Sequence, residues 1–307
     1  MKPEIALPIK RFVGKYIIKP PTLEKLPLNK RREKLIKFYK EKTGKDLDLD
    51  NCRSFTDKLQ WVKLYYKHPD MLKIVDKYLF KDYIKEKLGD GYVANLITVY
   101  NSPNEVKLCN IKQDKFVIKS TLQSDGNFII LVKDKNKVDL KSIEKEIKKN
   151  WFNKRKLLNN SFCSAYYGAK PRVIVEEYIE EFEGEANDYK LFCFGGNPKF
   201  FYVAEDHFKN GENSDNYPIT FYSLDWKPMD VSYGKHQRNE KVSKPYHIDQ
   251  MIEISKKLSE GFPFIRVDFF DTPNKLYLAE LTFYPGGGVT SYCPQSFDDM
   301  MGDMLKL

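Results

Sequence analysis

Long apolar segments are missing from this 307-residue sequence. No run approaches the roughly 18 apolar residues that a transmembrane helix needs, so none is expected. The first residues, MKPEIALPIKRFVGKY, hold prolines and charges where a signal peptide has an apolar core, so secretion is not expected. With 41% hydrophobic and 31% charged residues, the composition is typical of a globular chain with a substantial core. We therefore expect a folded cytoplasmic protein.

Cysteine and histidine are scarce. The five cysteines include no C-x-x-C pair, which indicates free thiols in a reducing compartment. The four histidines never fall at metal-ligand spacing on one helix, so a zinc site is not expected. The chain also lacks the G-x-x-x-x-G-K motif of P-loop proteins and the G-x-S-x-G motif of serine hydrolases.

Positive charge is concentrated at one end of the chain. Residues 1–46 contain 14 Lys or Arg and five Asp or Glu, and 14 − 5 = +9 is also the net charge of the whole chain. Nucleic-acid enzymes usually carry basic charge across the working surface, so we expect no nucleic-acid partner. A basic end fits peripheral contact with the inner membrane face or with an acidic glycan. A solvated helix in a lysine-rich proteome explains it equally well.

The hydrophobic pattern predicts a helical start of roughly 90 residues, followed by mixed structure. Segments rich in β-branched and aromatic residues then predict strands, and we expect an α+β fold with mostly antiparallel sheets. The expected elements are helices at 28–42, 54–66 and 71–88, strands at 92–100, 115–122 and 128–134, a helix at 140–158, a strand at 172–180, a hairpin at 189–206, a helix ending at Gly261, and a final hairpin.

The final hairpin carries charges inside apolar strands. Side chains alternate along a strand, so Arg266 and Asp268 share one face, as do Glu280 and Thr282 on the next strand. A five-residue turn at 271–275 would place Arg266 opposite Glu280 and all four side chains on one face. A four-residue turn would split them between opposite faces.

Two converging carboxylates beside an arginine need a balancing charge, because buried unpaired charges are costly. A divalent metal would supply that charge, and Mg²⁺ prefers oxygen ligands completed by water and phosphate. The alternative is a cross-strand ion pair of Arg266 with Glu280, which would leave Asp268 exposed.

Seven sequence blocks together resemble the TupA-like ATP-grasp family of cell-surface polysaccharide biosynthesis. The resemblance runs from about residue 33 to the C-terminus, and the blocks that carry it occur in this order: SFTDKLQWVKLYY, DKYLFKDYI, KFVIKS, IVEEYIE, DYKLFCFGGNPKF, GFPFIRVD and AELTFYPGGG. The resemblance implies an ATP-grasp fold, in which two α+β subdomains grip ATP behind a helical N-terminal region. It also implies a ligase that joins a carboxylate to an amine through an acyl-phosphate at the expense of ATP.

On this resemblance the chain divides into four regions. We expect a basic helical region at 1–60, a helical and strand segment before the grasp at 61–110, the small lid subdomain at 111–180, and the large subdomain with the metal site at 181–307.

The resemblance also implies which residues hold the nucleotide. Lys77 and Lys119 would reach the ATP phosphates as compact positive charges. The loop residues Ser124, Gly126 and Asn127 would cover the phosphates with backbone N–H groups. The remaining positions are Glu177, Tyr178 and Ile179 for the adenine hinge, and either Glu181 or Glu185 for the ribose.

Catalytic and metal roles follow from the same resemblance. Lys119, Lys190 and Arg266 would act on the phosphates and on the transferring phosphoryl group, where positive charge stabilises the transition state. The implied ligands of one or two Mg²⁺ ions are Asp268, Glu280 and Thr282.

Two positions depart from the family pattern. Leu122-Gln123-Ser124-Asp125-Gly126 stands where the family commonly has His-Gly-Ser-Gly-Gly, and glycine is what lets a backbone approach phosphate closely. This loop is therefore expected to close differently, or to turn Asp125 toward the metal or an amine substrate. Thr282 stands where Asn is usual, and its hydroxyl can still ligate Mg²⁺ or bind a water.

The expected substrates are a uronic acid or similar carboxylate on a sugar nucleotide or lipid-linked glycan, and an amine or amino acid. A sugar kinase or a glycosyltransferase of the same pathway is the alternative enzyme, and the altered loop suggests a non-catalytic ATP-binding scaffold. Residues 46–50, DLDLD, resemble the D-x-D motif of glycosyltransferases. They follow a helix end instead of a buried strand, so we interpret them as a polar linker.

Overall fold

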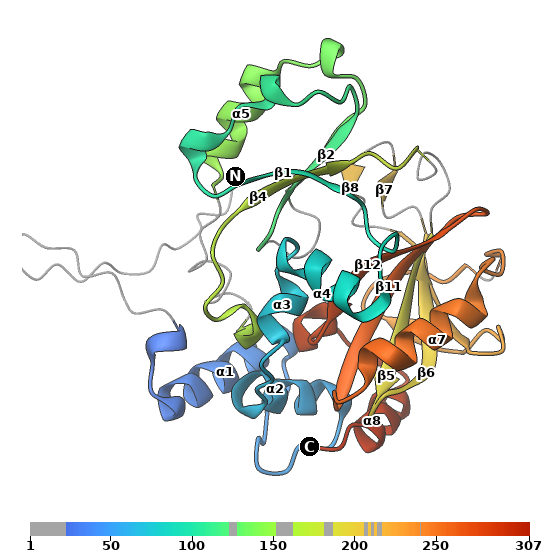
Figure 1. The fold of residues 1–307 in the computed structure, drawn as a ribbon. Helices are drawn as coiled ribbons and strands as arrows, with labels where there is room; N and C mark the ends of the chain where they lie inside the picture. Colours follow the sequence, from blue (N-terminus) through green and yellow to red (C-terminus); the bar gives the residue numbers. More distant parts are fainter. Residues whose placement is uncertain are drawn as a thin grey trace, which may run out of the picture.

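Two antiparallel sheets, one small and one large, organise the computed structural model (Figure 1). The small sheet has the strand order β1-β4-β2-β3, and the large sheet has the order β12-β11-β5-β6-β9. Two-stranded ribbons, β10-β13 and β7-β8, complete the described strands. The structure describes residues 23–122, 128–151, 162–180, 187–205, 208–209, 212–213, 217–239 and 241–307.

The N-terminal part is helical, as the sequence predicts. Its helices are α1 (Leu28–Thr43), α2 (Phe55–Tyr65), α3 (Met71–Val75) and α4 (Leu79–Leu88). The Ser54 hydroxyl accepts a hydrogen bond from the Asp57 N–H (3.2 Å) and so caps the start of α2. No helix in the described ranges is both long enough and apolar enough to span a membrane.

The single helix predicted over 71–88 is wrong, because the chain breaks at Asp76 between α3 and α4. The Asp76 carboxylate accepts from the N–H groups of Tyr78 (2.9 Å) and Leu79 (3.4 Å), which gives the backbone a local alternative to a continuous helix. Its other oxygen accepts from Arg172 at 3.1 Å. This break places Lys77 in a turn instead of inside a helix.

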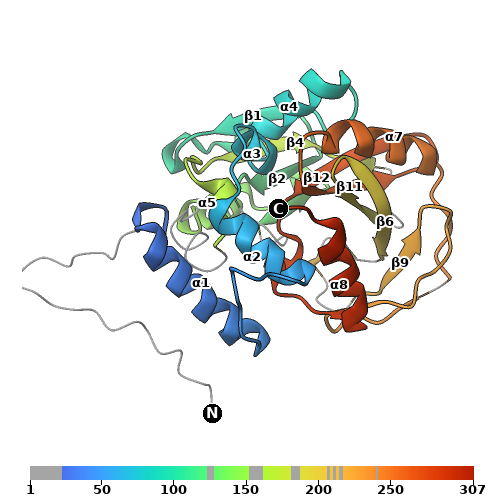
Figure 2. The same ribbon diagram turned by 90° about the horizontal axis from the view of Figure 1, so that it is seen from below.

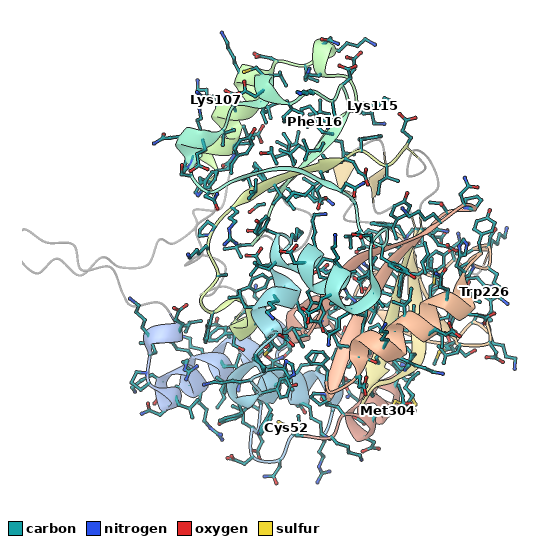
Figure 3. The ribbon with its side chains drawn as sticks, in the orientation of Figure 1. Cys52, Lys107, Lys115, Phe116, Trp226 and Met304 are labelled. Carbon is teal, nitrogen blue, oxygen red and sulfur yellow. The ribbon has the colours of Figure 1, made fainter. Side chains whose placement is uncertain are left out.

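The small sheet packs against α5 (Leu140–Lys149) and has its own apolar core, which includes Phe116, Val132 and Ile147. Figure 3 shows Phe116 in this part of the molecule, far from Trp226 and Met304 in the large part. Its strands are β1 (Leu96–Tyr100), β2 (Phe116–Ser120), β3 (Ile129–Val132) and β4 (Val173–Glu177), close to their predicted positions. The helix predicted to reach residue 158 ends at Lys149, and residues 152–161 lie outside the described ranges.

The large sheet is covered on both faces. Helix α7 (Ile248–Ser259) packs on one face, while α2 and α8 (Gln295–Met304) lie side by side on the other (Figure 2). Its strands are β5 (Asp188–Phe194), β6 (Asn197–Ala204), β9 (Ile219–Ser223), β11 (Phe264–Asp271) and β12 (Leu276–Thr282); the short strands are β7 (Phe208–Lys209), β8 (Glu212–Asn213), β10 (Ser232–Tyr233) and β13 (Tyr292–Cys293). The α2–α4 helices share this main core, so they belong to the same packed body as the large sheet.

Candidate functional site

The hairpin of β11 and β12 brings four polar side chains to one face of the large sheet. Arg266 pairs with Thr282, and Asp268 pairs with Glu280. The prediction that Arg266 stands opposite Glu280 is wrong, but the predicted grouping of all four side chains on one face is confirmed.

Two local features set this register. The turn has four residues, 272–275, instead of the expected five. Thr272 closes it, because its hydroxyl donates to the Lys275 carbonyl (2.8 Å) and accepts from the Lys275 N–H (3.0 Å). The register then shifts by one residue between Asp268 and Phe269, as in a β-bulge. The bulge restores the shared face that a four-residue turn alone would have split.

Asp268 is the centre of a buried charge cluster. Its carboxylate is 0% exposed and accepts from Arg266 Nε (2.7 Å), Arg266 Nη2 (2.5 Å) and Lys190 Nζ (2.9 Å). Lys190 also lies 2.6 Å from Asp188 on its own strand. The alternative of an Arg266–Glu280 pair with Asp268 exposed is excluded, because Arg266 pairs with the buried Asp268.

Both cations of this cluster are held in their charged forms. Desolvation opposes the charge on Arg266, but the Asp268 carboxylate raises its pKa well above the usual value. Desolvation likewise opposes the charge on Lys190, and the carboxylates of Asp188 and Asp268 raise its pKa above the usual value. Burial raises the pKa of the neighbouring Tyr202, whose hydroxyl lies 3.4 Å from Arg266 Nη1. Arg266 and Lys190 are therefore fixed positive charges at any working pH.

A second charged group joins the two parts of the protein. Lys119 of β2 and Lys81 of α4 each lie 2.6 Å from the buried Glu176 carboxylate of β4. Burial lowers the pKa of Lys77, against the opposing attraction of the Glu280 carboxylate. Helix α3, which precedes the turn that carries Lys77, packs against β12, so this lysine adjoins the hairpin that carries Glu280.

The predicted adenine hinge follows directly after β4. The Glu177 carboxylate accepts from the Asn95 N–H and Nδ2, both at 2.8 Å. The Tyr178 ring lies 6.0 Å from Lys115 Nζ, and Ile179 is half-buried. Backbone atoms of this segment can still meet a base, as the prediction requires. Five predicted positions lie outside the described ranges: Ser124, Gly126, Asn127, Glu181 and Glu185.

Sequence reasoning missed four polar residues of this site. Asp188 had an available signal, because its two-residue spacing from Lys190 puts both on one strand face. Glu176 and Glu177 are adjacent, so one of them faces inward, but the sequence does not say which. Nothing local identifies Lys81 or Tyr202, whose partners come from distant segments.

The hairpin offers oxygen donors for a metal. Asp268 and Glu280 are directly paired, and Thr282 follows two residues later. Within the described ranges, no group of three or more His, Cys, Asp or Glu side chains is arranged to hold a metal by itself. Both Asp268 oxygens also accept bonds from Arg266 or Lys190. These donors fit a Mg²⁺ that is completed by phosphate oxygens and water instead of an all-protein cage.

The glycine loop after β12 is held by helix α2. Lys63 Nζ donates to the Gly287 carbonyl (2.5 Å), and Gln60 Nε2 donates to the Gly288 carbonyl (2.5 Å). Gly286, Gly287 and Gly288 all have left-handed backbones, with φ of 56°, 61° and 65°, a region that glycine adopts without steric cost. The loop that follows the predicted metal ligands is therefore fixed to the main body.

Gly286→Ala is expected to destabilise the protein by about 1–3 kcal/mol more than Gly287→Ala. A Cβ at Gly286 would clash with the Thr290 and Tyr233 side chains, whereas at Gly287 it would meet only Val289 at 3.9 Å. Both changes carry the same backbone strain, so Gly287→Ala is the matched control. Urea unfolding measures the difference, and equal losses would show that the loop is not tightly packed.

Lys63 is 2% exposed, and its ammonium lies over the rings of Phe38 and Tyr284. Burial lowers its pKa from 10.5 to about 8. Between these values the unfolded chain binds a proton that the folded chain does not bind. The free energy of unfolding therefore rises with pH there, by up to about 1.4 kcal/mol per unit.

Lys63→Met is expected to remove this rise. Between about pH 8 and pH 10, the free energy of unfolding should rise more steeply with pH for the wild type than for the variant. Chemical denaturation at several pH values measures the difference, with the exposed Lys85→Met as control. Parallel curves for wild type and Lys63→Met would contradict the lowered pKa.

Comparison with protein families identifies the class to which this geometry belongs. The model of the TupA-like ATP-grasp family matches residues 57–306. The chain therefore belongs to the TupA-like ATP-grasp family, as its sequence blocks predict.

Three ligases are among the solved structures to which the chain is similar. One is the D-alanine–D-alanine ligase of Bacillus anthracis complexed with ATP (13% identity, covering 68% of this chain and 56% of that chain, TM-score 0.39). Another is the L-amino acid ligase of Bacillus licheniformis (13%, 73% and 44%, TM-score 0.39). The third is the ATP-grasp ligase PsnB complexed with minimal precursor, Mg and ADP (11%, 81% and 66%, TM-score 0.36). The chain spans little more than half the length of the first of these. A search of curated proteins gave no match.

Proposed function

We propose that the protein is an ATP- and Mg²⁺-dependent carboxylate–amine ligase. The observation that carries this proposal is the buried cluster of Arg266, Lys190 and Asp268, which adjoins Glu280 and the lysine group of Lys77. Fixed charges of both signs on one sheet face suit a transferring phosphoryl group and its metal. Membership of the TupA-like ATP-grasp family supports the same reaction class.

The nucleotide lies between the two sheets in this proposal. Lys77 and Lys119 bind its phosphates, and the segment 177–179 meets the adenine through backbone atoms. The loop residues Ser124, Gly126 and Asn127 cover the phosphates, and Glu181 or Glu185 binds the ribose.

The residues that would hold Mg²⁺, together with phosphate oxygens, are Asp268, Glu280 and Thr282. When bound, the metal would neutralise the phosphates and polarise the bond that breaks. Arg266 and Lys190 keep their positive charges at working pH, so they stabilise negative charge on the transferring group without having to gain a proton.

The reaction proceeds in two displacements. A carboxylate oxygen of the first substrate attacks the γ-phosphorus of ATP, and ADP leaves. The amine then attacks the acyl carbon of the resulting acyl-phosphate, inorganic phosphate leaves with the carboxylate oxygen, and the amine loses a proton to solvent. Lys119, Lys190 and Arg266 act mainly by positioning and charge neutralisation, as in other phosphoryl transfers.

The proposed carboxylate is a uronic-acid-type sugar of a bacterial capsule or surface-polysaccharide precursor, and the proposed second substrate is an amine or amino acid.

The proposed location is the cytoplasm, with residues 1–46 in peripheral contact with the inner membrane. Several basic side chains of α1 already pair with acids, for example Lys30 with Glu33 and Lys40 with Asp46, so the contact depends on the remaining ones. Sedimentation with anionic vesicles at low and high salt tests this membrane contact. The contact is contradicted if the protein does not bind the vesicles at low salt.

We also propose the four-region division at 1–60, 61–110, 111–180 and 181–307. Strand β1 of the second region pairs with β4 of the third, so the small sheet contains strands from both regions.

An ADP-release assay with a panel of uronic acids and amines tests the proposed activity. ADP that appears only when a carboxylate and an amine are both present supports the ligase. ADP formed with a sugar hydroxyl alone would indicate a kinase instead. Tight ATP binding without turnover under any condition would indicate a scaffold.

A further inference from the structure

Lys81 is a half-buried lysine that the proposed reaction does not use. Its side chain is 13% exposed, and its ammonium lies 2.6 Å from Glu176 Oε1. It also donates to the Ala94 carbonyl. The second oxygen of the same carboxylate lies 2.6 Å from Lys119, so one buried carboxylate, 6% exposed, is shared by two lysines.

The two lysines come from different parts of the protein. Lys81 stands on α4, whose neighbours Phe80 and Ile84 belong to the main core with the large sheet. Lys119 and Glu176 stand on adjacent strands of the small sheet, which has a separate core. The Glu176 carboxylate is therefore held from the main body and from the small sheet together.

The charges of these three side chains explain what the second lysine contributes. If Glu176 paired with Lys119 alone, the two charges would cancel, and the lysine would attract phosphate weakly. With Lys81 on the other oxygen, the three side chains carry a net charge of +1 around a carboxylate that is itself buried. Coulomb attraction to an anion is stronger there than in water, so a shared carboxylate leaves Lys119 effective.

We propose that Lys81 is a positioning residue of the nucleotide site, which holds Glu176 from the α4 side and thereby sets the place and the available charge of Lys119. The inference rests on the proposed function, because Lys119 is taken to bind ATP phosphates. Lys81 itself acts through Glu176 and does not touch the reacting atoms.

Isothermal titration of the full-length protein with Mg²⁺-ATP tests this inference. Lys81→Met should weaken binding by about tenfold, the scale typical of residues that orient a ligand-binding side chain. Lys81→Arg keeps the charge and should stay within about threefold of wild type. Lys85→Met, one turn further along α4 and exposed, should bind as wild type. If Lys81→Met does not fold, Lys81→Gln replaces it, because a glutamine side chain is neutral, polar and shorter than lysine.

A double-mutant cycle with Glu176→Gln shows whether Lys81 acts through Glu176. In the Glu176→Gln background, Lys81→Met should change ATP affinity by no more than about twofold, because the group on which it acts is gone. The inference is overturned if Lys81→Met binds ATP as wild type, if Lys81→Arg is as weak as Lys81→Met, or if the loss persists undiminished in the Glu176→Gln background. A wild-type protein that binds no Mg²⁺-ATP would instead refute the proposed function itself.

Discussion

Asp268→Asn is expected to lower ATP-dependent turnover by on the order of 10²–10³-fold. The carboxylate accepts three hydrogen bonds from Arg266 and Lys190 and is the proposed metal ligand nearest to both. A neutral amide cannot balance two buried cations or hold Mg²⁺ as strongly. Steady-state ADP release measures the loss, and circular dichroism shows whether the variant is folded.

Asp303→Asn, at an exposed position of α8, is the matched control for this change and should leave turnover unaltered. A Mg²⁺ titration tests the metal role specifically, because the apparent affinity for Mg²⁺ should fall together with the rate. The metal assignment is wrong if Asp268→Asn combined with Glu280→Gln retains both Mg²⁺-ATP binding and turnover.

Phe55→Ala is expected to lower the free energy of unfolding by about 3–5 kcal/mol. Phe55 is fully buried, and its ring lies 4.8 Å from Phe264 and 5.7 Å from Phe194 on the large sheet. The change leaves a cavity between α2 and the sheet that the neighbouring rings cannot fill. Urea denaturation measures the loss.

Tyr246→Ala removes an aromatic side chain that is 68% exposed and should change stability by no more than about 0.5 kcal/mol. If Phe55→Ala were equally mild, α2 would not be part of the large-sheet core. That result would make the N-terminal helices a separable unit instead of part of the body that carries the site.

The sequence predicts the elements well where the pattern is local. Helix α1 and strands β2 to β6 lie within a few residues of their predicted positions, because period and turn residues determine them. The break at Asp76 escaped prediction, because apolar residues continue through it at helical spacing and only a side-chain cap shows the change.

The site could be predicted on the hairpin and only in part elsewhere. Alternation along β11 and β12 groups Arg266, Asp268 and Glu280 on one face, and this grouping survives although the turn length is wrong. The turn is one residue shorter than predicted, and the bulge compensates for this difference. The local sequence pattern does not predict that combination. The sharing of Glu176 by Lys81 and Lys119 depends on how two separate cores meet, and the sequence pattern holds no information about that contact.

The most direct test of the proposed ligase follows an oxygen atom. A uronic acid accepted in the ADP-release panel is labelled with ¹⁸O in its carboxylate and is incubated with the protein, Mg²⁺-ATP and the amine. Mass spectrometry of the inorganic phosphate should show one ¹⁸O per phosphate, formed in step with the amide, because that oxygen leaves the acyl carbon with the phosphoryl group. Unlabelled phosphate, or a phosphate that stays on a sugar hydroxyl, would contradict the account.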